Sequence, residues 1–374
     1  MNRKLLLSVN SAWNIANFRG GLIRALQADG WEVVAAAPED AHADRVRALG
    51  CRFVALPMDS GGTHPLRDLI LYRRYRALLR SERPAAFLGF TIKPNVYGSF
   101  AAHSLGIPVV NNIAGLGTAF IRHTWLTQVA RFLYKRALHR SHRVLFQNED
   151  DRRYFVESGL VGASRTDRVP GSGIDLDAFA WQALPARTGA EPVRFLFVGR
   201  LLRDKGVVEY VAAARELRRR GVAAEFAMLG PAGVENRSAV SQSELDAWIH
   251  EGAIRYLGFT DDVRPMLAAA HCIVLPAYRE GVPRTLLEAA SMGRPLIATD
   301  AVGCRDVLDD GSNGYLVRIG DSDDLAEKCA RFAALPHEAQ ARMGLASRRK
   351  VEREFDEQLV FDKYIQYLTP LRAC

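Results

Sequence analysis

Cysteine is scarce in this sequence, and its spacing excludes a disulfide framework. The five cysteines, at positions 51, 272, 304, 329 and 374, form no CxxC pair, and their number is odd. Disulfide-rich secreted domains carry an even number of closely spaced cysteines, and structural zinc sites carry paired ones. We therefore expect a reduced, cytoplasmic protein that depends on a hydrophobic core.

Long apolar runs are also missing. No stretch approaches the ~18 consecutive apolar residues that a membrane-spanning helix requires. The N-terminal run LLLSV is too short for a signal peptide and no small-residue cleavage site follows it, so we predict a buried strand there. A chain of 374 residues, 48% apolar and 25% charged, is typical of a globular protein with two domains.

Two phosphate-binding fingerprints do not occur. The first predicted strand is followed by NSAWNIANFRGG, which lacks the GxGxxG turn of nicotinamide and flavin dinucleotide sites. The GxxxxGK[ST] loop of P-loop ATPases is absent as well. These absences disfavour dinucleotide-dependent enzymes and P-loop enzymes, and we expect no bound cofactor.

Acidic residues are under-represented in the first half of the chain. Residues 1–190 contain 25 Lys and Arg against 15 Asp and Glu, a net charge of +10. The remaining residues contain 25 against 27, a net charge of −2. An excess of positive charge on one half indicates an anionic partner, and nucleic acid, a phosphorylated lipid and an anionic membrane surface are the candidates.

Short apolar runs alternate with segments of helical periodicity along both halves. The runs are apolar throughout rather than at every second residue, which is typical of parallel strands covered by helices on both faces. The pattern predicts an α/β chain with two Rossmann-like, doubly wound parallel-sheet domains that face a cleft, with ligands at the carboxyl ends of the strands. The predicted strands are 5–9, 31–37, 52–56, 85–90, 108–113 and 143–147 in the first half, and 193–199, 224–229, 254–259, 271–276, 295–299 and 314–317 in the second.

Composition places the domain boundary near the middle of the chain. The segment ALPARTGAEP, at 183–192, has two prolines and little periodicity and is typical of a linker. We expect an N-terminal domain over 1–180 and a C-terminal domain over 190–354. The final helical segment, 355–374, is expected to pack back on the first domain.

Two cations follow the first predicted strand of the second domain. In GRLLRDKG, at 199–206, Arg200 and Lys205 lie at or just beyond the carboxyl end of that strand. Arginine offers a planar fork and lysine a compact charge, so the pair can hold a diphosphate. Either residue alone is as easily a solvated loop residue, and only their joint position favours a phosphate site.

The stretch YREGVPRTLLEAASMG contains the start of a short helix. We predict a loop over Tyr278–Pro283 at the carboxyl end of a strand, and then a helix from Arg284 to Met292 that ends at Gly293. The backbone N–H groups near Val282–Leu286 lack helical partners in such a turn, and the helix dipole favours negative charge there. This helix start therefore suits a phosphate.

Two acids of the same stretch suit a nucleotide sugar. Glu280, just before the turn, could accept hydrogen bonds from sugar hydroxyls. Glu288, one turn into the helix, could reach the two hydroxyls of a ribose. The alternative for Glu288 is a favourable charge near a helix N-terminus, which contributes about 0.3–1 kcal/mol.

These motifs in this order resemble the retaining family 4 glycosyltransferases of GT-B fold. The resemblance rests on E-x7-E, on GRLLRDKG and on the run IRYLGFTDDVRPMLAAAHCIVLPA between them, and it spans nearly the whole chain. It implies catalytic roles for Arg200 and Lys205 on the donor diphosphate and for Glu280 on the donor sugar. It also implies that Glu288 contacts the ribose.

The resemblance implies further donor contacts. The nucleotide base is expected against the loop that matches Leu257–Thr260, and therefore against Leu257 and Gly258. After the first EG the family usually has an aromatic residue and a glycine, where this chain has Val282 and Pro283, so the sugar contacts of this loop stay open. The donor-binding residues expected along this loop and helix start are Gly281, Val282, Pro283, Arg284, Thr285 and Leu286.

Two segments of the first half resemble those of bacterial surface-glycan transferases that act on undecaprenyl-diphosphate-linked sugars, including α-1,3-N-acetylgalactosaminyltransferases. FTIKPNVYGS and NNIAGLGTAF each follow a predicted strand, although their prolines and glycines equally suit plain turns. The same resemblance brings Arg19 and Gly20 near the donor. The expected acceptor-binding residues are Lys93, Asn95, Asn112, Gly115 and Gly117.

A lipid-linked acceptor would account for the basic first half. WLTQVARFLYKRALHR, at 125–140, and LRDLILYRRYRALLR, at 66–80, both mix basic with large apolar residues. Each Lys or Arg near an anionic leaflet contributes about 1 kcal/mol, so a few suffice for reversible, peripheral attachment to the cytoplasmic leaflet. Ordinary solvated helices with one face in the core are the alternative.

The resemblance implies retaining transfer of a hexose or N-acetylhexosamine from a nucleotide sugar, expected to be UDP-linked, to a lipid-diphosphate-linked glycan. No metal is required if cations and backbone amides stabilise the leaving group. The one DxD, Asp175 to Asp177, is better explained by capping.

A nucleotide-sugar epimerase could share the architecture. A two-lobed solute-binding protein would need export, and no nucleic-acid-binding motif occurs.

Overall fold

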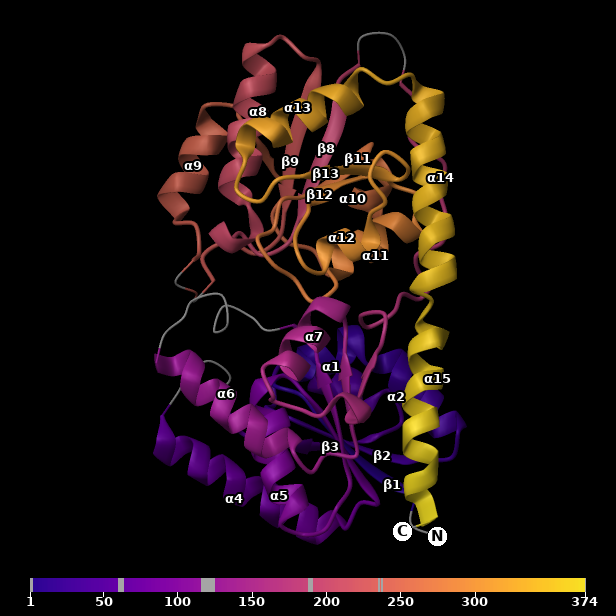
Figure 1. Ribbon diagram of the computed structural model, residues 1–374. Coiled ribbons are helices and arrows are strands. Elements are labelled where there is room, and N and C mark those ends of the chain that lie inside the picture. The colour runs from indigo at the N-terminus through magenta and orange to yellow at the C-terminus, as the bar shows by residue number, and fades with distance from the viewer. Residues whose placement is uncertain are drawn as a thin grey trace. The chain divides into compact units, whose positions relative to one another are not determined.

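The computed structural model describes residues 3–59, 64–115, 125–187, 191–234, 236 and 238–373, and it divides the chain into two compact units. Unit 1 comprises Met1–Ser172 and Glu357–Cys374, and unit 2 comprises Gly173–Asp356. Each unit contains one parallel sheet with helices on both faces (Figure 1). Across the described part of the chain, no helix is both long and apolar enough to traverse a bilayer.

The sheet of unit 1 confirms the six strands predicted for the first half and adds a seventh. Its order is β3-β2-β1-β4-β5-β6-β7, and all neighbouring strands are parallel. The seventh strand has the sequence TDR and no apolar side chain, so only its edge pairing with β6 identifies it. The strands are β1 (Lys4–Ser8), β2 (Glu32–Ala37), β3 (Arg52–Ala55), β4 (Ala86–Phe90), β5 (Val109–Ile113), β6 (Arg143–Phe146) and β7 (Thr166–Arg168).

Alternate residues of the unit 1 strands pack on opposite faces of the sheet. Leu5 and Leu7 of β1 belong to one core cluster, whereas Leu6 belongs to another that includes Tyr75 of α4. The helices are α1 (Ala12–Phe18), α2 (Gly20–Ala28), α3 (Ala43–Arg47), α4 (Pro65–Glu82), α5 (Ser99–His103), α6 (Trp125–Leu138), α7 (Glu149–Glu157) and α15 (Glu357–Leu368), with a π-helical turn η1 (Pro94–Gly98) and short 3-10 turns at η3 (Ala163–Arg165) and η5 (Thr369–Ala373).

The last helix, α15, completes unit 1 from the far end of the chain. It lies beside α2 (Figure 1), and its Phe361 and Tyr364 are buried in the same cluster as β1. The Tyr364 hydroxyl accepts a hydrogen bond of 2.8 Å from Asn112 on β5. Lys363 forms an ion pair of 2.6 Å with Asp167 on β7.

The sheet of unit 2 has the order β10-β9-β8-β11-β12-β13, again all parallel, and it confirms the six strands predicted for the second half. The strand predicted at 254–259 is shorter than expected because Gly258 adopts a φ of +73°, which turns the chain away from the sheet. The strands are β8 (Val193–Val198), β9 (Ala224–Leu229), β10 (Arg255–Tyr256), β11 (Cys272–Leu275), β12 (Leu296–Thr299) and β13 (Gly314–Val317).

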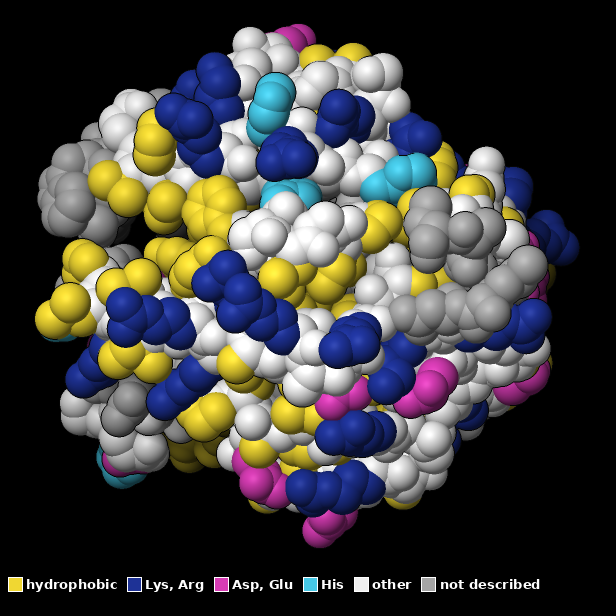
Figure 2. Space-filling view, turned by 90° about the horizontal axis from the view of Figure 1, so that it is seen from below, with side chains coloured by type: hydrophobic (Ala, Val, Ile, Leu, Met, Phe, Trp, Pro, Cys, Tyr) yellow, Lys and Arg dark blue, Asp and Glu magenta, His cyan; other side chains and the backbone are white. Residues whose placement is uncertain are grey.

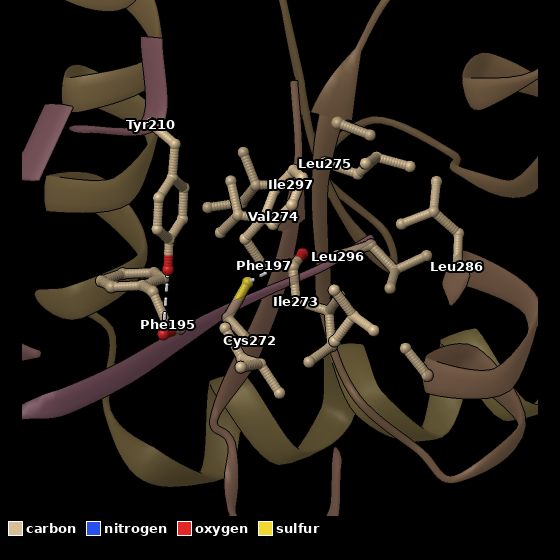
Figure 3. Close-up of a cluster of buried hydrophobic side chains, with 14 of the residues drawn as sticks. Phe195, Phe197, Tyr210, Cys272, Ile273, Val274, Leu275, Leu286, Leu296 and Ile297 are labelled. Carbon is tan, nitrogen blue, oxygen red and sulfur yellow. Dashed lines mark hydrogen bonds between the residues drawn. The ribbon is translucent and has the colours of Figure 1, made fainter. Parts of the chain in front are cut away.

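Buried side chains of β8, β11 and β12 form the centre of unit 2, where the Tyr210 ring of α8 and Leu286 of α11 pack from either side (Figure 3). The Tyr210 hydroxyl is satisfied by carbonyls of Phe195 and Ala227, each at 3.0 Å. The helices are α8 (Val207–Arg219), α9 (Gln242–His250), α10 (Arg264–Ala269), α11 (Arg284–Ser291), α12 (Cys304–Val307), α13 (Ser322–Ala333) and α14 (His337–Glu354), with a 3-10 turn η4 (Arg203–Lys205).

The chain leaves unit 1 between Ser172 and Gly173, ahead of the segment 183–192 that composition predicts as the linker. The residues just before and at the start of the predicted linker belong to unit 2 because Arg294 holds them there. Its fully buried guanidinium donates hydrogen bonds to the carbonyls of Gln182 and Ala183. Leu184 is buried as well. The start of this predicted linker is therefore irregular in structure but held against unit 2 at Gln182, Ala183 and Leu184.

Candidate active site

Glycines terminate three adjacent strands at the carboxyl edge of the unit 2 sheet. The Gly230 N–H donates to the Gly258 carbonyl, and a Cβ on Gly230 would lie 2.0 Å from the Gly199 carbonyl oxygen. No larger residue fits this approach. The ends of β8, β9 and β10 are therefore drawn together beside Arg200 and Leu257, the residues that follow two of these strands.

The Lys205 turn is fixed against the loop that follows β11. Gly206 has a φ of +76°, and a Cβ there would lie 2.1 Å from the Pro276 carbonyl oxygen. The Tyr278 N–H donates to the Asp204 carbonyl at 3.0 Å. These two contacts hold GRLLRDKG and YREGVPR together, although 70 or so residues separate them in the sequence.

Lys205 and Glu280 form an ion pair across these two loops. Their side chains are 23% and 15% exposed, so both are largely shielded but still reachable from solvent. The Glu280 backbone is held from behind, because its N–H donates to Val302 at 3.0 Å and Gly303 lies too close to Gly281 for any Cβ. The structure thus brings together two of the three residues predicted to be catalytic.

Arg200, the third of these, is exposed on the same edge. Its guanidinium has no hydrogen-bond or ion-pair partner among the residues that the structure describes. Leu257 and Gly258 continue from the end of β10, with the Leu257 N–H donating to Met228 at 2.8 Å. A long, unpaired guanidinium beside this edge can reach an anion that Lys205 also contacts.

The helix start predicted as a phosphate site begins where expected. Helix α11 runs Arg284–Ser291 and Gly293 follows its end with a φ of +77°. No side chain caps the N-terminus, and the preceding Pro283 has no N–H. The sequence predicts that the Leu286 N–H is available to a phosphate, but it donates to the Pro283 carbonyl at 3.1 Å.

The donors left at this helix start are the N–H groups of Val282 and Thr285, which have no partner in the described ranges. The Thr285 hydroxyl donates to the Val198 carbonyl at the end of β8, at 3.2 Å. This bond places the start of α11 directly beside the strand that leads to Arg200. The segments that carry these two amides, Lys205 and Arg200 therefore meet at the same sheet edge.

Glu288 is paired within its own helix. Its carboxylate accepts from the Arg284 guanidinium at 3.1 Å, and the same guanidinium donates to the Gly173 carbonyl at 3.2 Å. Burial raises the pKa of Glu288, and the Arg284 charge opposes that rise. Arg284 thus orients Glu288 instead of facing outward to a ligand, which the sequence pattern did not indicate.

The polar residues expected to bind an acceptor in unit 1 lie in its interior. Asn95 is 1% exposed and Asn112 is fully buried, and the Asn95 amide donates to the Asn112 carbonyl at 2.8 Å. The Asn111 side-chain amide donates to the Asn95 side-chain oxygen and to the Ser99 hydroxyl, each at 2.9 Å. The Asn95 amide thus holds β5 against the turn η1, and direct acceptor contact by these two asparagines stays a prediction.

Lys93 is also paired with a buried carboxylate. Its ammonium forms an ion pair of 2.8 Å with Asp68 of α4, and the Tyr97 hydroxyl donates to the other oxygen of Asp68 at 2.8 Å. The pKa of Tyr97 is raised, first by burial and then by Asp68. Lys93 therefore balances Asp68 and is 8% exposed, a position unlike that of a free phosphate ligand.

The remaining unit 1 candidates are Arg19, Gly20, Gly115 and Gly117. Arg19 is 5% exposed, with its guanidinium 4.2 Å from the centre of the Phe90 ring, and Gly20 is buried as well. Gly115 adopts a φ of +125°, which only glycine tolerates, and Gly117 lies outside the described residues.

The DxD aspartates form a turn, as capping chemistry predicts. Asp175 accepts from the N–H groups of Asp177 and Ala178 through one carboxylate oxygen, at 3.1 and 2.8 Å. Within the described ranges, no three His, Cys, Asp or Glu side chains gather closely enough to hold a metal ion.

Comparison with known proteins follows the division into two units. Residues 15–171 match the family described as "Glycosyl transferase 4-like domain", and residues 192–334 match "Glycosyl transferases group 1". The Anabaena protein HepE, solved in complex with UDP, superposes with a TM-score of 0.78 at 18% identity, over 98% of this chain and 100% of that one. This likeness extends to the whole fold.

Two curated relatives are similar over long stretches. One is the N,N'-diacetylbacillosaminyl-diphospho-undecaprenol α-1,3-N-acetylgalactosaminyltransferase of Campylobacter jejuni, 25% identical over 94% of this chain and 95% of the relative. The other is the UDP-Gal:α-D-GlcNAc-diphosphoundecaprenol α-1,3-galactosyltransferase of Escherichia coli, 25% identical over 77% and 75%. The chain belongs to the GT-B glycosyltransferases, with a 4-like domain followed by a group 1 domain.

Proposed function

We propose that this protein transfers a hexose or N-acetylhexosamine, with retention, from a UDP-sugar to an undecaprenyl-diphosphate-linked glycan in polysaccharide biosynthesis. The observation that carries the proposal is the convergence of Lys205, Glu280 and the uncapped start of α11 at one sheet edge. The relatives named above act on diphospho-undecaprenol-linked sugars, and one of them uses a UDP-sugar. Unit 2 is assigned the donor and unit 1 the acceptor.

The donor diphosphate would lie among Arg200, Lys205 and the N–H groups of Val282 and Thr285. As the bond between the sugar and the diphosphate breaks, negative charge grows on the leaving oxygen. Fixed cations and amide dipoles stabilise that charge without reorganising, which lowers the barrier. The proton of the acceptor hydroxyl passes to the leaving diphosphate while the acceptor oxygen bonds to the same face of the sugar, so the α configuration is kept.

Donor binding must open the ion pair between Lys205 and Glu280. A phosphate that contacts Lys205 competes with the Glu280 carboxylate, which is then released to accept hydrogen bonds from the sugar hydroxyls. Glu288, oriented by Arg284, is left to bind the ribose. In this proposal the ion pair keeps two charged side chains ordered until the substrate replaces each partner.

A donor screen tests the proposed reaction directly. Purified protein is incubated with each of several UDP-sugars and a short undecaprenyl-diphosphate-linked saccharide, and the product linkage is determined by NMR. We expect UDP release that depends on the acceptor, together with an α-linked product. A β-linked product would rule out retention, and no product with any of the UDP-sugars would overturn the proposed UDP-linked donor and lipid-linked acceptor.

The same screen separates transfer from epimerisation. An epimerase converts its nucleotide sugar in the absence of any acceptor, whereas a transferase leaves the donor sugar unchanged apart from slow hydrolysis. Both curated relatives are transferases, which favours the first outcome.

Peripheral attachment to the cytoplasmic leaflet is the second part of the proposal. Helices α4 and α6 both pack against η1, and each exposes large apolar side chains beside basic ones. Figure 2 shows hydrophobic side chains lying among Lys and Arg side chains on the underside of unit 1. The exposed apolar residues are Leu66, Leu69 and Ile70 on α4 and Val129 and Phe132 on α6, and the exposed basic residues include Arg67, Arg73, Arg74, Lys135 and Arg136.

Replacing Ile70 and Phe132 together by serine should reduce binding to phosphatidylglycerol vesicles at low salt. Insertion of both side chains removes apolar area from water, and their loss should lower the partition coefficient about tenfold or more. Co-sedimentation measures the bound fraction. Ile249→Ser, at a similarly exposed position on α9 of unit 2, is the control. Equal binding by both variants, or none by the unaltered protein, would contradict this surface.

A further inference from the structure

A cavity of about 480 Å³ lies in unit 1. It touches the residues considered so far only through Ser141, whose hydroxyl donates to the Asn111 side chain at 2.6 Å behind the cavity wall. It is formed where α5 and α6 end and where β5 and β6 are about to begin. Among its lining residues are His103, Pro108, Arg140, Ser141, His142 and Arg165. Four of these six side chains carry, or can carry, a positive charge.

The basic side chains of this cavity have no carboxylate partner in the described part of the chain. Arg165 is held in place by hydrogen bonds from one guanidinium nitrogen to the His139 carbonyl at 2.8 Å and to the Ser141 carbonyl at 3.1 Å. Its other guanidinium N–H groups remain available. Arg140 and His142 are exposed and make no side-chain hydrogen bond with another described residue.

His103 supplies a second observation at the same place. Its Nε2 atom is shielded from solvent and has no hydrogen-bond partner in the described structure, although an imidazole nitrogen that loses water normally gains one. Burial, and then the neighbouring charges of Arg140, Arg165 and His139, together lower the pKa of His103 to about 4. The pKa of His142 is lowered by burial and by Arg143 and Arg165.

The position of this cavity separates it from the proposed reaction. Pro108 directly precedes β5, and Ser141 and His142 directly precede β6, so the cavity lies at the amino ends of these strands. Ligands of doubly wound sheets bind outside the carboxyl ends, which is the opposite edge. Neither the donor nor the acceptor proposed above would occupy it.

We infer that this cavity is a binding site for a phosphate group, in which Arg140 and Arg165 supply charge-assisted donors and the His103 imidazole completes the set. Paired guanidinium groups suit the planar, multidentate recognition of phosphate oxygens. The cavity is larger than one phosphate needs, so it can hold a phosphate ester as well as a free ion. The ester could be soluble or the headgroup of an anionic phospholipid.

Titration with inorganic phosphate and with glycerol 3-phosphate, followed by the imidazole resonances of His103 in the full chain, tests this site. A bound anion favours the charged imidazole, so the pKa of His103 should rise and its resonances should shift at constant pH. Arg140→Gln should weaken the apparent affinity about tenfold, because a hydrogen bond between charged groups is lost. Arg153→Gln is the control, since Arg153 is also an exposed arginine of unit 1 without a partner in the described ranges.

A second arm uses phosphatidylglycerol vesicles against neutral phosphatidylcholine vesicles. If the ligand is a lipid headgroup, the same His103 shift appears with the anionic vesicles and is lost in Arg140→Gln. If only the soluble esters produce it, the site stands and its ligand is soluble. The site is refuted if millimolar phosphate leaves His103 unchanged, or if Arg140→Gln and Arg153→Gln weaken binding equally.

Discussion

Lys205→Ala should lower kcat for glycosyl transfer about 100- to 1,000-fold, because in the proposed reaction this cation stabilises charge that grows on the leaving diphosphate. The fixed position of the lysine supports this magnitude. Gly206 and the Asp204 carbonyl lock its turn against the loop of Glu280, so the ammonium does not have to be reordered as the reaction proceeds. Initial rates with saturating donor and acceptor give the measurement, and KM for the donor should rise as well.

The matched control is Arg203→Gln. Arg203 is in the same 3-10 turn as Lys205, but it is paired with Glu244 of α9 and is 48% exposed. Removing its charge changes the net charge of the turn equally, so an unspecific electrostatic effect would slow both variants. We expect the control to retain nearly full activity.

A double variant separates catalysis from mere pairing. If the Lys205–Glu280 ion pair is only structural, each single replacement leaves one shielded charge without a partner, and Lys205→Met with Glu280→Gln should restore most of the lost rate. If the two side chains act on different parts of the donor, the double variant should be at least as slow as the slower single variant. Recovery in the double variant would contradict the assigned roles.

Arg294→Met should reduce the stability of unit 2 by at least about 4 kcal/mol, since several buried carbonyls lose their donor at once. The Arg294 guanidinium is fully buried and donates to the carbonyls of Gln182, Ala183, Met292, Ala268 and Ala270. Burial lowers its pKa to about 10, which still leaves it charged at neutral pH. Methionine fills similar space but donates to none of these groups.

Thermal unfolding and amide hydrogen exchange measure this effect. Besides a lower Tm, the variant should show faster amide exchange over residues 181–184, because the hydrogen bonds from Arg294 to the carbonyls of Gln182 and Ala183 are lost. Arg255→Met is the control, at a 71% exposed arginine that forms a surface ion pair with Glu225. A variant at 294 that melts within a degree of the unaltered protein would show that water replaces the guanidinium without cost.

The sheets could be predicted from the sequence because buried parallel strands are apolar throughout. LLLSV and HCIVLPA are found as strands near their expected bounds, whereas β7 was missed because TDR contains nothing apolar and gains its place only by pairing with β6. The Gly258 turn shortened another strand. Local composition thus identifies strands with apolar side chains, including the edge strands β3 and β13, and misses a polar edge strand such as β7, which depends on its partner.

The candidate site was partly predictable for a related reason. Residues directly after strands meet at one edge, which explains why Lys205 and Glu280 come together. The pairing of Arg284 with Glu288, and of Lys93 with Asp68, could not be read from the chain, because nothing in a linear sequence shows whether a charged residue already has a buried partner. Asp68 in particular lies 25 residues away from Lys93.

Because α15 fills a gap beside α2 and β5, the two units differ in how they can be made. Unit 2 is one uninterrupted length of chain, whereas unit 1 is made of two separate lengths. Unit 1 begins first at the ribosome, yet Phe361 and Tyr364 reach it only after all of unit 2 has been synthesised. The half that starts folding earliest is therefore finished last, and its nascent core remains incomplete throughout translation.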